Sequence, residues 1–258
     1  MVSGQLHSSV YGPCGVDDQS MTEISGPPNS GKSLVLQQLM AHCLVPYEYG
    51  GRQMSIILIN LSHKITKESL GKAVLDELRS HSKAAEDPSA EAKFTEIAKR
   101  CVSRVRILAC FSTDDVSNSL RKVTYMVASD STVELIALDT LSEFFWLDHP
   151  SRKQFLSKYK FYQEWLGTLS TLSRKCLISA MFTVDYRFLI NQHGERFPAV
   201  EVHTVKMEIG EGGFTLNGLP VLFENGIKVS TVAVKSSITS CQRKVFDRTE
   251  VPPGHTSL

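Results

Sequence analysis

The chain has 258 residues, enough for one large α/β domain and too few for two domains of ordinary size. Its net charge of +1 argues against strong non-specific nucleic-acid binding by the whole surface, because such binding needs an excess of cations. Hydrophobic residues make up 42% and charged residues 21%, which is typical of a globular protein. The pattern indicates neither a membrane-spanning segment nor a secretion signal.

The cysteines are scattered and contain no Cys-x-x-Cys pair. This pattern argues against a disulfide framework or a zinc site, and it favours a reducing intracellular compartment. The six residues are Cys14, Cys43, Cys101, Cys110, Cys176 and Cys241.

The first half of the chain alternates between predicted strands and helices. Residues 1–20 are polar, and we expect them to cover the core loosely. A short strand at 21–25 leads into a glycine-rich loop, and helical spacing of apolar residues predicts a helix at 30–43. The apolar run at 55–61 is typical of a strand buried on both faces of a parallel sheet. The next predicted elements are a helix at 64–81, a loop at 82–90, a helix at 91–103 and a strand at 105–110.

The alternation continues beyond residue 110. Asp114 or Asp115 can cap a helix that ends near residue 129. An apolar strand at 133–138 is closed by Asp139. A helix at 154–174 and a buried strand at 176–182 follow.

The pattern changes after residue 182. The stretch 186–202 looks like a loop, and short alternating segments such as 227–234 indicate antiparallel strands. The sequence therefore predicts an α/β fold with a mostly parallel, twisted sheet flanked by helices and an antiparallel C-terminal extension. The predicted division is an N-terminal segment 1–20, one main α/β domain 21–248 and a disordered tail 249–258.

A phosphate-binding loop is the strongest motif in the chain, since it matches the pattern Gly-x-x-x-x-Gly-Lys-Ser in full. Its residues are Gly26, Pro27, Pro28, Asn29, Ser30, Gly31, Lys32 and Ser33. The glycines let backbone N–H groups turn onto phosphate oxygens, and the following helix adds its positive N-terminal end. Lys32 can reach the β- and γ-phosphates of ATP, and Ser33 can offer its hydroxyl to Mg²⁺. The alternative is a glycine turn without a ligand.

Asp139 ends the apolar strand Glu134-Leu135-Ile136-Ala137-Leu138-Asp139. A carboxylate in this place, about a hundred residues after a phosphate-binding loop, normally helps to position Mg²⁺. The alternative is an aspartate that merely ends the strand. The aromatic run that follows, Phe144-Phe145-Trp146-Leu147-Asp148, favours a core or subunit contact over base stacking.

Three stretches carry a family resemblance. They are Met21-Thr22-Glu23-Ile24-Ser25-Gly26-Pro27-Pro28 before the lysine, Leu44-Val45-Pro46 with Gly50-Gly51, and Leu138-Asp139-Thr140-Leu141-Ser142 with the aromatic run. Over about residues 12–235 the chain resembles the eukaryotic RecA-type recombinases, and within them the recombinase paralogues of the X-ray repair cross-complementing type. The resemblance implies a RecA-like P-loop NTPase core.

The resemblance also implies a function in homologous-recombination DNA repair in the nucleus. Such paralogues bind ATP, assemble with other RecA-like paralogues into small heteromers, and modulate the filament of the main recombinase on single-stranded DNA. A membrane is not an expected partner.

Three features depart from the family pattern. Active members place an Ile-Asp-Thr-Glu run where this chain has Ile59-Asn60-Leu61-Ser62, and neither Asn60 nor Ser62 is a useful base at neutral pH. Glu143 is a candidate substitute. No glutamine follows the strand at 176–182, where Thr183 is a weaker candidate sensor of the γ-phosphate. The Phe-x-x-Ala tether is missing, since the first phenylalanine is Phe94, so we expect a heteromer instead of a homopolymer.

Two basic stretches are candidates for single-stranded DNA contact, within a complex at least. The first has cations interleaved with aromatic residues, a combination that suits a single strand, although it also fits the solvated face of a helix. The second could be an ordinary connector. The candidate residues are Arg152, Lys153, Lys158 and Lys160 in the first stretch, and Arg187 and Arg196 in the second.

The sequence therefore favours an ATP-binding mediator of recombination with weak or no hydrolysis. A DNA-dependent ATPase that exchanges strands is the first alternative. An unrelated P-loop small-molecule kinase is the second, although neither a lid nor a set of acceptor-binding arginines is evident.

Overall fold

One mixed sheet forms the centre of the computed structural model, which describes residues 3–12, 19–81, 88–148, 157–197, 202–210, 213–223 and 226–230. The strands lie in the order β1-β10-β9-β8-β7-β2-β6-β5-β3-β4. Their bounds are β1 Ser3–Gln5, β2 Met21–Gly26, β3 Ser55–Asn60, β4 Val105–Ala109, β5 Val133–Asp139, β6 Ser179–Asp185, β7 His203–Gly210, β8 Gly213–Leu216, β9 Leu219–Leu222 and β10 Lys228–Ser230.

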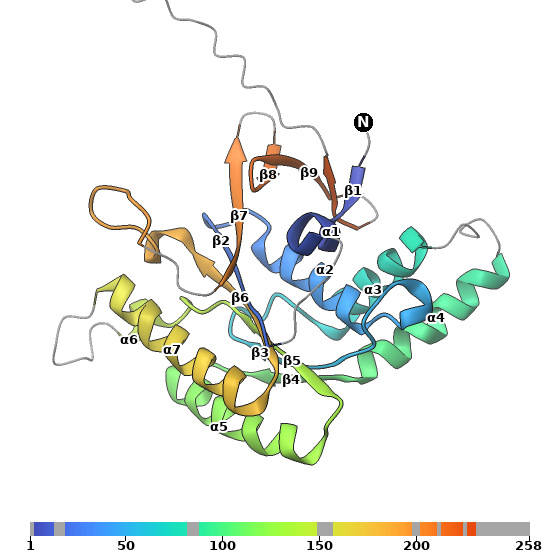
Figure 1. The fold of residues 1–258 in the computed structure, drawn as a ribbon, viewed down its shortest axis with the longest axis horizontal. Helices are drawn as coiled ribbons and strands as arrows, with labels where there is room; N and C mark the ends of the chain where they lie inside the picture. The colour runs from blue at the N-terminus through green and yellow to red at the C-terminus, as the bar shows by residue number, and fades with distance from the viewer. Residues whose placement is uncertain are drawn as a thin grey trace, which may run out of the picture.

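Helices cover both faces of this sheet (Figure 1). Their bounds are α1 Leu6–Tyr11, α2 Lys32–Leu44, α3 Lys67–His81, α4 Pro88–Ser103, α5 Thr113–Ser129, α6 Phe145–Asp148 and α7 Lys158–Cys176. Short 3-10 helices lie at Tyr47–Tyr49 and Tyr186–Phe188. Among the described residues, none of the helices is long and apolar enough to cross a bilayer.

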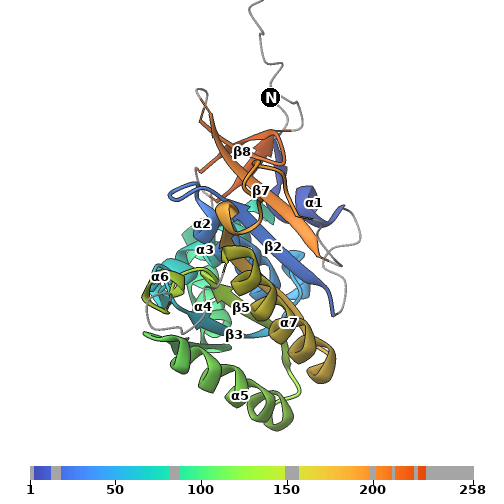
Figure 2. The ribbon, with the colours of Figure 1, turned by 90° about the vertical axis from the view of Figure 1, so that its left-hand side faces the viewer.

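The sheet has a parallel and an antiparallel part. Strands β7, β2, β6, β5, β3 and β4 pair in parallel. Strands β8, β9, β10 and β1 continue the sheet beyond β7 in antiparallel pairs. Figure 2 shows this antiparallel part above the parallel part and its helices. The predicted α/β fold with a parallel core and an antiparallel extension is confirmed.

Two hydrophobic clusters hold the layers together, one on each face of the sheet. The first joins α2, α3 and α4 to one face, and Leu36, Leu39 and Leu70 are at most 1% exposed within it. The second joins α5 and α7 to the other face around Phe161 and Phe182. Strands β2 and β3 are buried along their whole length, because helices cover them on both sides.

The N-terminal residues are more ordered than expected. Strand β1 pairs with β10, and Leu6 of α1 is buried in the same cluster as α2. A three-residue strand carries no periodic pattern, so the sequence could not predict this pairing.

Several element ends also differ from the predictions, and α4 begins at Pro88, inside the predicted loop at 82–90. The cap of α5 is Ser112, whose Oγ accepts a hydrogen bond from the backbone N–H of Asp115. The side-chain Oδ2 of Asp115 in turn accepts a hydrogen bond from the backbone N–H of Phe111. Cys176 belongs to α7, and Leu177 ends that helix in the left-handed conformation, so β6 begins only at Ser179. Positions 149–156 and the predicted tail lie outside the described residues.

Candidate nucleotide-binding site

The carboxyl ends of the parallel strands form the edge at which the predicted site residues meet. Gly26 at the end of β2 pairs in register with Asp185 of β6, and Asn60 of β3 pairs with Asp139 of β5. Ligands of open α/β sheets bind at this edge. A pocket of about 520 Å³ opens here, and its lining includes the loop residues Pro28 to Ser33 together with Thr140, Glu143, Trp146, Asp185, Arg187 and Phe188. Its volume lies in the range of ligand pockets.

The glycines of the loop fill places where a larger residue would clash. A Cβ on Gly26 would lie 2.6 Å from both the carbonyl oxygen of Met207 and Oγ of Ser30. Gly31 has φ of 85°, which disfavours other residues, and a Cβ there would lie 2.9 Å from the ring of Phe223. The loop backbone therefore packs closely against Met207 of β7 and against Phe223.

The start of α2 offers N–H groups to this pocket. Gly31 is the N-cap, and no side chain caps the helix. Ser30 is fully buried, and its Oγ has no hydrogen-bond partner among the described residues. Free helix N–H groups and an unpaired hydroxyl are donors that suit a phosphate. Pro28 and Asn29 lie exposed at the mouth, and Pro27 contributes its carbonyl.

Lys32 holds the loop closed. Its Nζ donates a hydrogen bond of 2.7 Å to the carbonyl oxygen of Pro27. Burial lowers the pKa of Lys32, and the negative charge of Asp185 acts against this shift. An anion in the pocket would therefore meet an ammonium group that is already positioned and poorly solvated.

Asp139 is completely buried and lies beside Ser33, and the role of this pair in positioning Mg²⁺ stays a prediction. Its Oδ1 accepts hydrogen bonds from Ser33 Oγ at 2.9 Å and Thr183 Oγ1 at 2.5 Å. Its Oδ2 accepts one from Ser62 Oγ at 2.5 Å. Thr140 also donates to Oδ1. A carboxylate surrounded by hydroxyl groups suits Mg²⁺ held through water, because Mg²⁺ gives up its waters reluctantly.

The residues in place of the water-activating carboxylate have other contacts. Asn60 is buried and donates from Nδ2 to the carbonyl oxygen of Ile65. Ser62 is the hydroxyl that contacts Asp139. Thr183 contacts Asp139 as well, so its hydroxyl serves that carboxylate and not the pocket. Glu143 is exposed and lines the pocket, which keeps it as the candidate substitute.

Asp185 and Arg187 form an ion pair at the pocket that the sequence reasoning missed. The Oδ2 of Asp185 lies 2.5 Å from Nη2 of Arg187. Burial raises the pKa of Asp185, but the hydrogen bonds from the side chain and backbone of Arg187 outweigh it, so the pKa lies below its ordinary value. An aspartate at a strand end followed by an arginine two positions later was the available indication.

The residues predicted to contact DNA differ in their neighbours. Lys158 lies over the ring of Trp146, 5.1 Å from its centroid, and Lys160 is exposed. Arg187 lines the pocket of about 520 Å³ at the end of the parallel strands. Arg152 and Lys153 lie outside the described residues. DNA contact by all of these residues stays a prediction.

Arg196 is held by a buried carboxylate. Its Nη2 lies 2.6 Å from Oε1 of Glu23, which is completely buried in β2. The hydroxyl of Tyr162 donates to the other oxygen at 2.6 Å, and burial together with the Glu23 charge raises the pKa of Tyr162. This contact gives Arg196 a structural role, and its contact with DNA also stays a prediction.

The aromatic run is divided between core and surface. Phe144 and Phe145 are buried, whereas Trp146 is 59% exposed and Leu147 is 69% exposed. Phe145 packs edge-on against Phe161 and Phe188. The preferred interpretation of this run as core or subunit contact agrees with the burial of its first two residues.

Comparison with known proteins finds relatives that include two proteins named for DNA repair. The chain is 26% identical to the DNA repair protein XRCC2 of Mus musculus over 168 residues, which are 65% of this chain and 53% of XRCC2. It is 30% identical over 91 residues to the DNA repair and recombination protein RadB of Thermoplasma volcanium, which are 35% of this chain and 38% of RadB. The chain thus matches about half of the first relative and less of the second. No protein-family model matches it.

Proposed function

Because the chain is a distant homologue of RecA-like DNA repair and recombination proteins related to XRCC2 and RadB, we propose that it is an ATP-binding mediator of homologous recombination. In this proposal it binds ATP with Mg²⁺, hydrolyses it slowly or not at all, and uses the bound nucleotide to organise a surface for partner RecA-like paralogues. It acts with them on the recombinase filament on single-stranded DNA in the nucleus.

The observation that carries the proposal is the contact between Ser33 and Asp139 beside the glycine loop. These residues are 106 positions apart in the sequence, and Oγ of Ser33 lies 2.9 Å from Oδ1 of Asp139. The pair supports Mg²⁺ binding, and the backbone N–H groups of the loop support binding of the phosphates. An Mg²⁺ ion beside Ser33 and Asp139 would neutralise part of the negative charge of the ATP phosphates.

Slow hydrolysis is inferred from the end of β3. Asn60 and Ser62 stand where a general base is needed, and both are engaged in other hydrogen bonds. Neither residue takes up a proton at neutral pH, so neither activates a water molecule well. Binding and turnover are therefore separable in this protein.

The alternative is a DNA-dependent ATPase, and the exposure of Glu143 at the pocket favours it. Single-turnover hydrolysis with and without single-stranded DNA separates the two functions. A mediator shows little turnover in both conditions. DNA-stimulated turnover that Glu143→Gln abolishes would establish the ATPase.

Replacement of Lys32 by alanine tests nucleotide binding directly. Lys32→Ala removes a charge-assisted contact worth about 1.5–3 kcal/mol, so the affinity for MgATP falls roughly 10- to 150-fold. The exposed Lys122→Ala on α5 serves as the control and leaves the affinity unchanged. Isothermal titration calorimetry on the full chain, alone and with co-purified partners, measures both. Equal affinity of Lys32→Ala and the unchanged protein would contradict the proposal, as would a lack of MgATP binding by the latter.

A further inference from the structure

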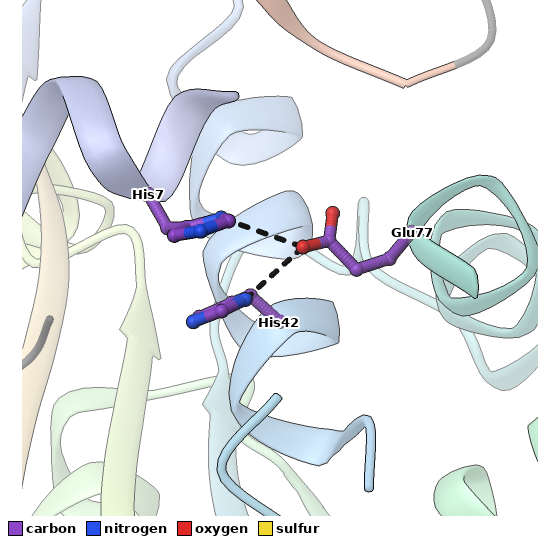
Figure 3. Close-up of side chains that lie close together, drawn as sticks. All are labelled: His7, His42 and Glu77. Carbon is purple, nitrogen blue, oxygen red and sulfur yellow. Dashed lines mark hydrogen bonds and ion pairs between the residues drawn. The ribbon is translucent and has the colours of Figure 1, made fainter. Parts of the chain in front are cut away.

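A buried cluster of two histidines and one glutamate lies near the carboxyl end of α2. His7 comes from α1, His42 from α2 and Glu77 from α3, and Figure 3 shows both imidazole rings directed at the same carboxylate oxygen. Nδ1 of His42 lies 3.0 Å and Nδ1 of His7 lies 3.4 Å from Oε1 of Glu77. His42 and Glu77 are each 6% exposed at the side chain, and His7 is 13% exposed.

These distances match the edges of a tetrahedral metal site. Zinc binds imidazole nitrogen and carboxylate oxygen at about 2.0–2.2 Å, and the edge of a tetrahedron with such bonds is about 3.3 Å long. The two nitrogen-to-oxygen separations of 3.0 and 3.4 Å lie on either side of that length. The longer one, from Nδ1 of His7, exceeds the usual length of an N–H···O hydrogen bond.

The charges in the cluster also favour a divalent cation. A buried carboxylate needs a compensating positive charge. A divalent ion would compensate the charge of Glu77, and imidazole binds metal ions in its neutral form.

A further side chain fixes the carboxylate of Glu77. Nε2 of Gln38 donates a hydrogen bond of 2.7 Å to Oε2, the oxygen that faces away from the histidines. Hydrogen bonds of this kind orient the ligands of metal sites. Gln38 lies one turn before His42 on α2, so a single helix supplies both a ligand and the group that positions another.

We propose that His7, His42 and Glu77 bind one Zn²⁺ ion, with water as the fourth ligand. Two imidazoles and one carboxylate are a known zinc donor set, and imidazole disfavours Ca²⁺ and Mg²⁺. The rings are within 8° of parallel, so one ring tilts out of the stack when the ion binds. His7 is the ring that moves, since it is the more exposed and comes from the short α1.

The ion would fasten β1 and α1 to α2 and α3. It lies far from the phosphate loop, since His42 is ten residues from Lys32 and a helix rises about 1.5 Å per residue, which gives roughly 15 Å. The site is thus independent of the proposed function. The scattered cysteines argue only against a thiolate site, and this donor set contains none.

Titration of the metal-free full chain with Zn²⁺, and with Co²⁺ as a spectroscopic probe, tests the site. We expect one ion per chain, visible absorption of tetrahedral Co²⁺, and a higher unfolding temperature with Zn²⁺ because the ion binds the folded state. His7→Ala should weaken Zn²⁺ binding at least 100-fold. Gln38→Ala should weaken it about 10- to 100-fold, because it removes the group that orients a ligand.

The control is His193→Ala, which removes an exposed histidine outside the cluster and should keep full Zn²⁺ affinity. His7→Ala removes the most exposed ligand, so the test does not depend on a variant of buried Glu77 that could misfold. The proposal fails if His7→Ala and the unchanged protein bind Zn²⁺ equally. It also fails if Co²⁺ gives an octahedral spectrum, or if the unchanged protein binds no Zn²⁺ and the cluster is only a hydrogen-bonded contact.

Discussion

The two ends of α2 carry two polar groupings of opposite character. At the amino end, six consecutive residues from Pro28 to Ser33 line an open pocket of about 520 Å³. At the carboxyl end, His42 contacts His7 and Glu77 from two other helices, and the three side chains are at most 13% exposed. A loop of adjacent residues can be identified from the sequence, whereas a cluster assembled from three helices exists only after the helices have packed.

The two ends also balance charge differently. Near the amino end, the buried carboxylate of Asp139 is surrounded by hydroxyl groups that carry no charge. Near the carboxyl end, the carboxylate of Glu77 faces two titratable rings and an amide. The first arrangement leaves net negative charge for a hydrated cation, and the second offers direct ligands to an ion.

The largest expected effect comes from the apolar stretch of α2 that joins the two ends. Leu39 is 1% exposed, and Leu39→Ala should lower the free energy of unfolding by about 2–5 kcal/mol through lost burial and a cavity. Leu34→Ala on the same helix is the control, because Leu34 is 50% exposed and should change stability by under about 0.5 kcal/mol. Urea unfolding measures both. Equal losses of unfolding free energy in the two variants would contradict the stabilising role of the buried face of α2.

A medium effect should appear at the amino end alone. Thr183→Val keeps the shape of the side chain but removes the hydroxyl that donates to Asp139 at 2.5 Å, at a cost of about 1–3 kcal/mol. The Thr183→Val variant should bind MgATP more weakly than the unchanged protein, and it should bind Zn²⁺ with unchanged affinity. Thr168→Val removes only an exposed hydroxyl that bonds to the carbonyl of Glu164, and it serves as the control. A change in Zn²⁺ affinity would show that the two ends are coupled.

The smallest effect concerns acid stability at the pocket. The pKa of Asp185 is lower in the folded chain than its ordinary value, so the unfolded chain takes up this proton at a higher pH. The ionised carboxylate of Asp185 therefore stabilises the folded chain above about pH 4, and this stabilisation is lost as the pH falls below that value. Asp185→Asn should cost under about 1 kcal/mol at neutral pH, because Arg187 is 47% exposed, and the difference should vanish in acid. A difference independent of pH, measured by urea unfolding, would contradict this.

The sequence predicted the parallel core and the phosphate loop because their patterns are local. Continuous apolar runs indicated β3 and β5 to within one residue. Asp139 was chosen because it ends an apolar strand about a hundred residues after the phosphate loop. The start of β6 was predicted too early, because Cys176, Leu177 and Ile178 are apolar although a left-handed helix end intervenes.

The remaining contacts could not be predicted because they depend on tertiary structure. Arg187 and Arg196 look like cations for a nucleic acid until the fold places Asp185 and Glu23 against them. His7, His42 and Glu77 lie about 35 positions apart, and no motif joins them.

Pairing of β1 with β10 has a consequence for the order of folding. Ser3 lies opposite Ser230, so β1 can pair with its partner only after more than two hundred further residues have been made. Closing so long a loop is slow, and strand pairs of this kind form late. The amide protons of β1 should therefore be among the last to gain protection from hydrogen exchange during refolding, well after those of β2 and β3.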